Sequence, residues 1–228
     1  MNEILIKTEN ISKTLAGEVP VTLVNNVSLE VRKGEFVVIT GPSGSGKSSL
    51  LYLLGLLDTP TSGKIWLNGT DTSSYGENEL ADFRLAELGF VFQFHFLLPE
   101  FTALENVMLP MQRLGRLPAA EITTRAEELL ASLGMAEQKH KLPKQLSGGQ
   151  QQRVAIARCL ANNPLLILAD EPTGNLDTSS AANVQHILRD LAHQGDHAVI
   201  AVTHDPNFAA IADHVFTIVD GKLQNGRK

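Results

Sequence analysis

Residues 41–48, GPSGSGKS, combine the residue types and the spacing that a polyphosphate site needs. They follow the apolar run EFVVIT and precede the apolar run SLLYLLGLL, so the pattern G-x-x-x-x-G-K-S lies between a predicted strand and a predicted helix. Glycines let backbone N–H groups surround phosphate oxygens, Lys47 reaches the terminal phosphates, and the Ser48 hydroxyl can ligate Mg²⁺. This segment, the phosphate loop, predicts a nucleotide site.

Two carboxylates follow a second apolar run. The sequence LLILADE, residues 165–171, ends in Asp170, which we expect beside the metal, and in Glu171, which we expect to point towards the terminal phosphate. A carboxylate at that position can polarise the attacking water and take its proton. The alternative interpretation of Glu171, a solvated helix cap, stays open.

Two further polar residues end predicted strands. His204 closes VIAVTH and is expected at the edge where open α/β sheets bind ligands, so it can hydrogen-bond the terminal phosphate. Gln93 closes LGFVFQ, and its amide is a candidate to touch Mg²⁺ or the attacking water; a plain polar strand end is the alternative. The other histidines are interpreted as surface or core residues: His95, His140, His186, His193, His197 and His214.

Phenylalanines are concentrated directly after the strand that ends at Gln93. Four of the nine in the chain, Phe92, Phe94, Phe96 and Phe101, fall within ten residues, in and before FHFLLPEF. Such a stretch suits either the core or an apolar groove for a partner's helix. The sequence leaves both interpretations open.

The sequence LSGGQ, residues 146–150, has a serine and two glycines before an apolar helix. Its backbone N–H groups and the helix dipole can bind a phosphate, although it contains no lysine. Ser147 lies 100 residues after Lys47, across a helical stretch, and is poorly placed to fold back onto its own phosphate loop. Head-to-tail pairing of two copies would let each LSGGQ close over the nucleotide of the other copy.

The elements that position these residues predict an α/β fold with a helical insertion. Residues 4–39 alternate as strands, and a hairpin follows around Trp66. Helical periodicity runs from about 102 to 162, with Thr102 and Glu105 as a capping box and Gly134 as a stop. Beyond 164 strands and helices alternate again. We predict one domain over 1–228, with 1–93 and 163–228 as the core and 94–162 as a helical subdomain.

Composition narrows the function classes. The 228 residues include 43% hydrophobic ones, enough for a large core, and the net charge of −6 without a long Lys/Arg run argues against a nucleic-acid partner. The single cysteine, Cys159, is expected to be a buried apolar residue. Because no signal peptide and no run of about 18 apolar residues is found, we expect a cytosolic chain whose membrane role depends on a partner.

Taken in order, GPSGSGKS, Gln93, LSGGQ, LLILADE, NLD at 175–177 and His204 resemble the nucleotide-binding domain of ABC transporters over essentially the whole chain. FQFHFLLPEFTALENV and DEPTGNLD are most similar to the branch with the lipoprotein-release ATPases (LolD), the efflux protein MacB and the cell-division ATPase FtsE, with the closest match to the lipoprotein-release group. The implied fold is a P-loop NTPase of ABC type: a RecA-like core, an N-terminal antiparallel β subdomain and an inserted helical subdomain.

The resemblance implies a role for each motif residue, with ATP and Mg²⁺ as cofactors. Glu171 is the general base, His204 stabilises the terminal phosphate, and Ser48, Gln93 and Asp170 serve the metal. The phosphate contacts fall on Gly41, Pro42, Ser43, Gly44, Ser45, Gly46, Lys47, Ser48 and Ser49. The residues that act on the partner's nucleotide are Ser147, Gly148, Gly149 and Gln150, and those along the dimer interface are Asn175, Leu176 and Asp177.

One departure from the family concerns the base. Relatives place an aromatic ring near the position of Leu15, whereas residues 1–35 contain no Phe, Tyr or Trp. Leu15 and Val21 are the apolar candidates to contact the adenine, and weak base selectivity is expected.

The expected function is an ATPase engine at the cytoplasmic face of a membrane, which dimerises with ATP and moves integral permease subunits. A regulatory ATPase of the cell-division type, which transports nothing, is the alternative, because the same motifs serve both. A DNA-repair or translation ATPase is disfavoured, since 100 residues between Lys47 and Ser147 leave no room for a long coiled coil.

Overall fold

Two sheets organise the chain, which the computed structural model describes over residues 3–195 and 197–227. Positions 1, 2, 196 and 228 of the predicted domain lie outside the described residues. The antiparallel sheet contains, in spatial order, β2 (Val21–Arg32), β1 (Ile4–Leu15), β4 (Ser62–Leu67) and β5 (Thr70–Asp71). The second sheet contains β10 (Lys222–Arg227), β9 (His214–Val219), β3 (Phe36–Thr40), β8 (Ala198–Val202), β7 (Leu166–Asp170) and β6 (Leu88–Phe92).

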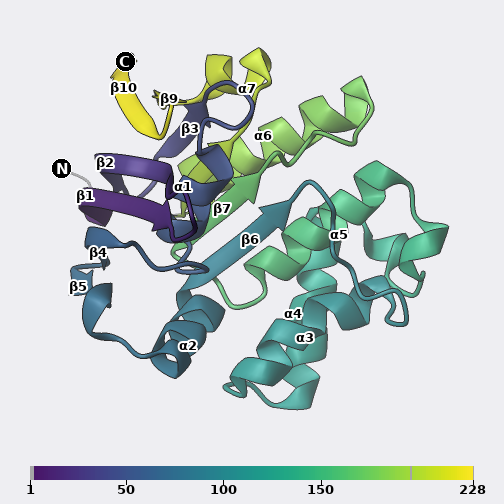
Figure 1. Cartoon of the computed structure of the whole chain (residues 1–228). Helices are drawn as coiled ribbons and strands as arrows, with labels where there is room; N and C mark the ends of the chain where they lie inside the picture. The colour runs from purple at the N-terminus through teal and green to yellow at the C-terminus, as the bar shows by residue number, and fades with distance from the viewer. Residues whose placement is uncertain (1–2, 196, 228) are drawn as a thin grey trace.

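Helices surround the second sheet and form a separate lobe beside it (Figure 1). The α-helices of the described residues are α1 (Lys47–Leu54), α2 (Glu77–Glu87), α3 (Ala103–Leu114), α4 (Ala119–Ser132), α5 (Gly148–Leu160), α6 (Thr178–Gly195) and α7 (Pro206–Ile211). Short 3₁₀ turns are η1 (Thr72–Ser74), η2 (Ala136–Gln138) and η3 (Pro143–Gln145). None of the helices in this part of the chain is long and apolar enough to cross a membrane.

The second sheet brings its polar strand ends to one edge. Neighbouring strands among β9, β3, β8, β7 and β6 are parallel, and their apolar sequences suit burial on both faces. In the register, Phe92 pairs with Asp170, Asp170 with Val202, and Val202 with Ile39. The residues that follow β3, β6, β7 and β8 therefore lie level with one another at the carboxyl edge.

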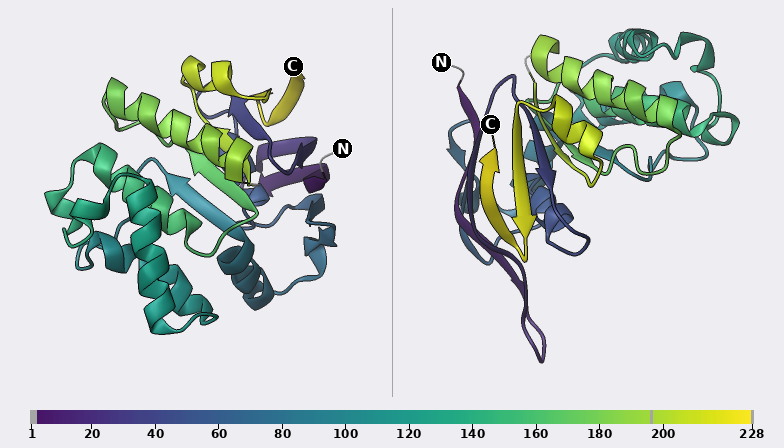
Figure 2. Two further views of the ribbon diagram at one scale, coloured as in Figure 1. Left: turned by 180° about the vertical axis from the view of Figure 1, so that it is seen from behind. Right: turned by 90° about the horizontal axis from the view of Figure 1, so that it is seen from above.

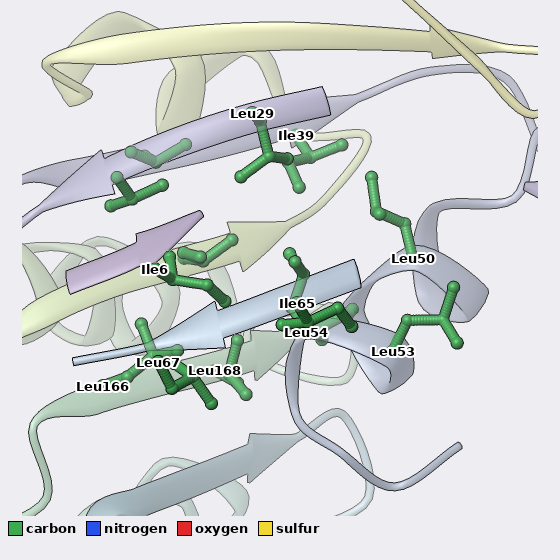
Figure 3. Close-up of a cluster of buried hydrophobic side chains, with 14 of the residues drawn as sticks. Ile6, Leu29, Ile39, Leu50, Leu53, Leu54, Ile65, Leu67, Leu166 and Leu168 are labelled. Atoms are coloured by element: carbon green, nitrogen blue, oxygen red, sulfur yellow. The ribbon is translucent and has the colours of Figure 1, made fainter. Parts of the chain in front are cut away.

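The core joins the two sheets through α1. Leucines of α1 are fully buried, and Figure 3 shows Leu50, Leu53 and Leu54 beside side chains of both sheets, among them Ile65 and Leu168. Because α1 begins at Lys47, this packing also fixes the direction of the phosphate loop that precedes it. Burial of apolar side chains is the main stabilising contribution to such a fold.

Helices α3, α4 and α5 pack around a core of their own, and the left view of Figure 2 shows them grouped beside the second sheet. The capping box of Thr102 and Glu105 begins α3, and Gly134 follows α4 with a φ of 69°, as predicted. This separate core supports the proposed subdomain of residues 94–162. Cys159 is buried as expected, and burial raises the pKa of its thiol to about 12, so it stays protonated.

Candidate functional site

The phosphate loop is held between β3, α1 and two neighbouring chain segments. The φ of Gly46 is 100°, and a Cβ there would lie 2.2 Å from the Leu23 carbonyl oxygen of β2, so only glycine fits. The backbone N–H of Gly221, in the turn after β9, donates to the Ser45 carbonyl oxygen at 3.0 Å. The loop is therefore fixed in shape by contacts on both sides.

Lys47 lies over this loop at the start of α1. Its Nζ donates to the carbonyl oxygens of Gly41 and Pro42, both at 2.9 Å. The ammonium group and the N-terminal N–H groups of α1 are thus gathered at one place, which suits an anion with several charges. The structure places residues 41–49 together as one continuous loop and helix start.

Asp170 meets Ser48 at the carboxyl edge of the second sheet. The Ser48 hydroxyl donates to Asp170 Oδ1 at 2.9 Å, and the Tyr52 hydroxyl donates to Oδ2 at 3.0 Å. Burial and, second, the Asp170 carboxylate raise the pKa of Tyr52 above its ordinary value. A carboxylate and a hydroxyl, completed by phosphate oxygens, are a donor set that fits Mg²⁺.

Tyr52 was missed by the sequence analysis. It lies four residues after Ser48, on the same face of α1, and that spacing was the available signal.

Glu171 is oriented by two side chains that follow β8. The Thr203 hydroxyl donates to Glu171 Oε2 at 3.0 Å, and His204 Nδ1 lies 2.9 Å from Oε1. The side chain of Glu171 is 19% exposed and that of His204 is 76% exposed, so the carboxylate is far more buried than the histidine that contacts it. Glu171 has a φ of 45°, a conformation that L residues adopt at a cost and that is common at functional sites.

A hollow of about 730 Å³ lies against Glu171 and His204, between α6 and α7. His186 lines it too, as an exposed residue of α6, which agrees with its interpretation as a surface residue. Thr203, which also lines this hollow, was another residue that the sequence analysis missed, because threonine directly before a histidine carries no motif.

Gln93 is joined to the 175–177 segment. Its Nε2 donates to Asn175 Oδ1 at 3.1 Å, and Asn175 Nδ2 donates back to the Gln93 carbonyl oxygen at 3.3 Å. Asp177 accepts hydrogen bonds from Ser179 and Ser180 and so caps α6; those from Ser180 lower its pKa. The segment predicted to lie along a dimer interface thus also begins a helix.

The LSGGQ motif forms the start of α5. Ser147 Oγ accepts from the Gln150 N–H at 3.3 Å, and Gln150 Oε1 accepts from the Ser147 N–H at 3.0 Å, which makes a capping box. A Cβ on Gly148 would lie 3.6 Å from Leu176 Cδ2, and one on Gly149 would lie 2.6 Å from Ser180 Oγ. The motif therefore packs on its own 176–180 segment.

Leu15 and Val21 face each other across the β1–β2 hairpin. Their exposed fractions are 47% and 52%. Val21 lies two residues before Leu23, whose carbonyl touches the phosphate loop at Gly46. The pair therefore forms an exposed apolar surface at the end of the β1–β2 hairpin.

Most of the aromatic stretch lies at the surface. Phe94 is 63% exposed and Phe96 is 62% exposed, while Phe92 is half-buried. The Phe92 and Phe96 rings meet edge to face, with centroids 5.4 Å apart. A cavity of about 350 Å³ adjoins Phe92, between α2, β6 and α5. The core interpretation is therefore wrong for Phe94 and Phe96. These two rings form an exposed aromatic surface, and the cavity lies beside it.

Comparisons with known proteins agree with this geometry. The family model described as ABC transporter matches residues 24–174. The lipoprotein-releasing system ATP-binding protein LolD 1 of Chlorobium chlorochromatii is 48% identical over an alignment of 230 positions, which covers 100% of this chain and 94% of that protein. The macrolide export ATP-binding/permease protein MacB of Vibrio parahaemolyticus is 44% identical over 98% of this chain and 34% of its own length.

A solved structure shares the fold. The dimeric structure of a post-hydrolysis state of the ATP-binding cassette MJ0796, bound to ADP and Pi, superposes with a TM-score of 0.90 at 41% identity and covers 98% of each chain. The family match, the full-length relative and the order of the site residues agree. The chain therefore belongs to the ABC transporter family, as one of its ATP-binding and ATP-hydrolysing domains.

Proposed function

We propose that this ATPase powers lipoprotein release or efflux through partner transmembrane subunits, by ATP-driven head-to-tail dimerisation of two copies. One observation carries the proposal: the Ser48–Asp170 pair and the Glu171–His204 pair lie at the same edge of the second sheet. The LolD relatives, at 48% identity over nearly full length, support lipoprotein release as the purpose. The cytoplasmic face of the membrane is the implied location.

In the proposed mechanism, the phosphate loop and Lys47 bind the ATP phosphates, and Ser48, Asp170 and Gln93 hold Mg²⁺, which would offset phosphate charge when bound. Glu171 accepts a proton from the attacking water. Because Nδ1 of His204 is used by Glu171, Nε2 is the nitrogen left to donate to the terminal phosphate. Thr203 keeps the carboxylate in place through its second oxygen.

Base recognition gives the first prediction. Replacing Leu15 by Tyr would add a ring to the exposed Leu15–Val21 surface, and stacking on a base is worth about 1–3 kcal/mol. We expect ATP to bind more tightly to Leu15→Tyr by about 1 kcal/mol, roughly fivefold. The wild type, which lacks the ring, is expected to hydrolyse ATP and GTP with comparable kcat/KM.

Nucleotide titrations of both proteins measure these differences, with Leu117→Tyr as a control, since Leu117 is also an exposed apolar residue but belongs to the linker before α4. A strong ATP preference in the wild type, with no gain from tyrosine at position 15, would mean that another residue recognises the base.

Docking of the membrane partner gives the second prediction. Phe96→Ala removes an exposed ring, and the exposed Glu100 can be charge-reversed to Lys; both should weaken the complex while the isolated chain keeps its basal ATPase rate. A central aromatic contact at an interface contributes about 2 kcal/mol or more, so the affinity for the permease should fall roughly 30-fold for Phe96→Ala.

Binding to the detergent-solubilised permease measures the loss, with Leu117→Ala as the matched apolar truncation away from the aromatic stretch. Unchanged affinity in Phe96→Ala and in Glu100→Lys would place the docking surface elsewhere. A large drop in Tm for Phe96→Ala would show that this ring stabilises the fold.

The whole proposal is tested with the membrane subunits that co-purify with the chain. Proteoliposomes that contain the complex and a labelled lipoprotein should release it when ATP and Mg²⁺ are added, and an ATP analogue that resists hydrolysis should not support repeated release. A complex that hydrolyses ATP but releases neither lipoprotein nor drug would favour the regulatory alternative of the cell-division type.

A further inference from the structure

A buried amide on α5 connects two segments that carry site residues. Gln152 is fully buried, and its Nε2 donates to the Pro172 carbonyl oxygen at 2.7 Å and to the Phe92 carbonyl oxygen at 3.3 Å. Phe92 directly precedes Gln93, and Pro172 directly follows Glu171. One side chain therefore bridges the backbone next to Gln93 and the backbone next to Glu171.

This amide is only partly satisfied. Gln152 Oε1 is buried and has no hydrogen-bond partner among the described residues. A buried acceptor without a partner lowers the stability of a fold, so packing alone does not explain an amide at this position. The contribution of Gln152 must lie in what its two N–H groups hold.

The helix that carries Gln152 is fixed to the rest of the molecule on two faces. Ile156 and Cys159 pack into the core under the second sheet, while Val154 and Ala157 pack into the core of the helical lobe. The LSGGQ motif begins this same helix, and Gln152 lies five residues after Ser147, about 7.5 Å along the axis. Because both belong to α5, any movement of the LSGGQ motif also moves the Gln152 amide.

We propose that Gln152 is a positioning residue for hydrolysis, which holds Gln93 and Glu171 at a fixed separation and ties both to the helix that begins with LSGGQ. This inference rests on the proposed function, because it presumes that Gln93 and Glu171 act on the same water. Without the bridge, ATP still binds to the phosphate loop, but the distance between the Gln93 and Glu171 side chains is no longer fixed. The loss falls on kcat and spares KM.

The first test replaces Gln152 by Met, which keeps the length and removes both donors. Displacement of a catalytic group by about 1 Å can slow a reaction 10²-fold, so we expect kcat to fall roughly 10- to 100-fold with KM for ATP unchanged. Asn162→Leu is the matched control: the Asn162 amide also bridges two carbonyl oxygens, those of Leu85 at 2.8 Å and Pro110 at 3.2 Å, away from the site. Its kcat should equal that of the wild type.

The second test uses Gln152→Glu, whose effect depends on pH. A protonated carboxyl group can donate its O–H to the Pro172 carbonyl oxygen, whereas the ionised form cannot. Burial among carbonyl groups raises the pKa of such a carboxyl, so the bridge is present below that pKa and is lost as the pH rises through it. The ratio of kcat in Gln152→Glu to kcat in the wild type should therefore fall with rising pH, while the ratio for Gln152→Met stays flat.

A kcat of Gln152→Met within twofold of the wild type, or an equal loss in Asn162→Leu, would overturn the inference. So would a pH-independent ratio for Gln152→Glu, a readout that remains usable if the methionine variant folds poorly. The wild type is measured in the same buffers for ATP-dependent dimerisation and hydrolysis. If it shows neither, the proposed function fails; if it shows both and the Gln152 variants match it, only this inference fails.

Discussion

Replacing Glu171 by Gln is expected to slow ATP hydrolysis by roughly 10²- to 10⁴-fold, the usual effect of removing a general base, while ATP still binds. In the wild type the Thr203 hydroxyl donates to Glu171 at 3.0 Å. The amide of the variant keeps an oxygen that can accept the same hydrogen bond, so the loop after β7 should keep its shape. The amide cannot take a proton from water. The closed dimer should then accumulate, because ATP is bound but not consumed.

Phosphate release measures the rate, and gel filtration with ATP and Mg²⁺ measures the dimer. Glu128→Gln is a suitable control, since it makes the same change in charge on an exposed residue of α4. A Glu171→Gln protein that hydrolyses ATP near the wild-type rate would remove Glu171 from the role of base and leave the interpretation as a helix cap.

Much of the sheet edge could be predicted because apolar strands and their polar ends are local features of a sequence. The ends of β3 and β7 follow from EFVVIT and LLILAD, and parallel strands bring their carboxyl ends together. The register confirms that expectation, because Ile39 pairs with Val202 and Val202 pairs with Asp170. The roles in hydrolysis assigned to Glu171, His204 and Gln93 stay predictions.

What could not be predicted depends on contacts between distant parts of the chain. The sequence analysis missed helix α2, of which Leu80 is the only residue buried, so its apolar periodicity is weak. Thr203 and Gln152 were missed because they act through hydrogen bonds to partners 20 to 60 residues away, which no local motif encodes. The spacing of Tyr52 from Ser48 placed it on the right face of α1, but its partner Asp170 is 118 residues away. The exposure of Phe94 and Phe96 was undecided for the same reason.

Mixing two inactive variants should restore activity if Ser147 acts on the nucleotide of the other copy. In a two-fold symmetric, head-to-tail dimer, each composite site takes Lys47 from one chain and Ser147 from the other. A dimer of one Lys47→Ala chain and one Ser147→Asp chain then has one intact site and one site with both defects. Equal mixing should yield about one quarter of the wild-type activity, because half of the dimers are mixed and each has one working site.

The structure favours Ser147→Asp over a change to Gly149. A Cβ on Gly149 would lie 2.6 Å from Ser180 Oγ, so a substitution there would disturb its own chain. Asp is a good N-cap residue and is stabilised by the helix dipole, so α5 should still begin at Gly148, while the added charge repels the terminal phosphate. Ser147→Asn, which caps equally well without charge, is the matched control and should keep much of the activity.

Each homodimer alone should be inactive, and the mixture is measured after the two tagged chains have been shown to co-purify. If Ser147 acted within its own chain, both chains of the mixed dimer would carry a defect in their own site and no activity would return. Zero activity in a verified mixed dimer would therefore reject the trans arrangement. Rescue would show that the LSGGQ motif, which lacks a lysine of its own, serves a phosphate that is held by the lysine of another copy.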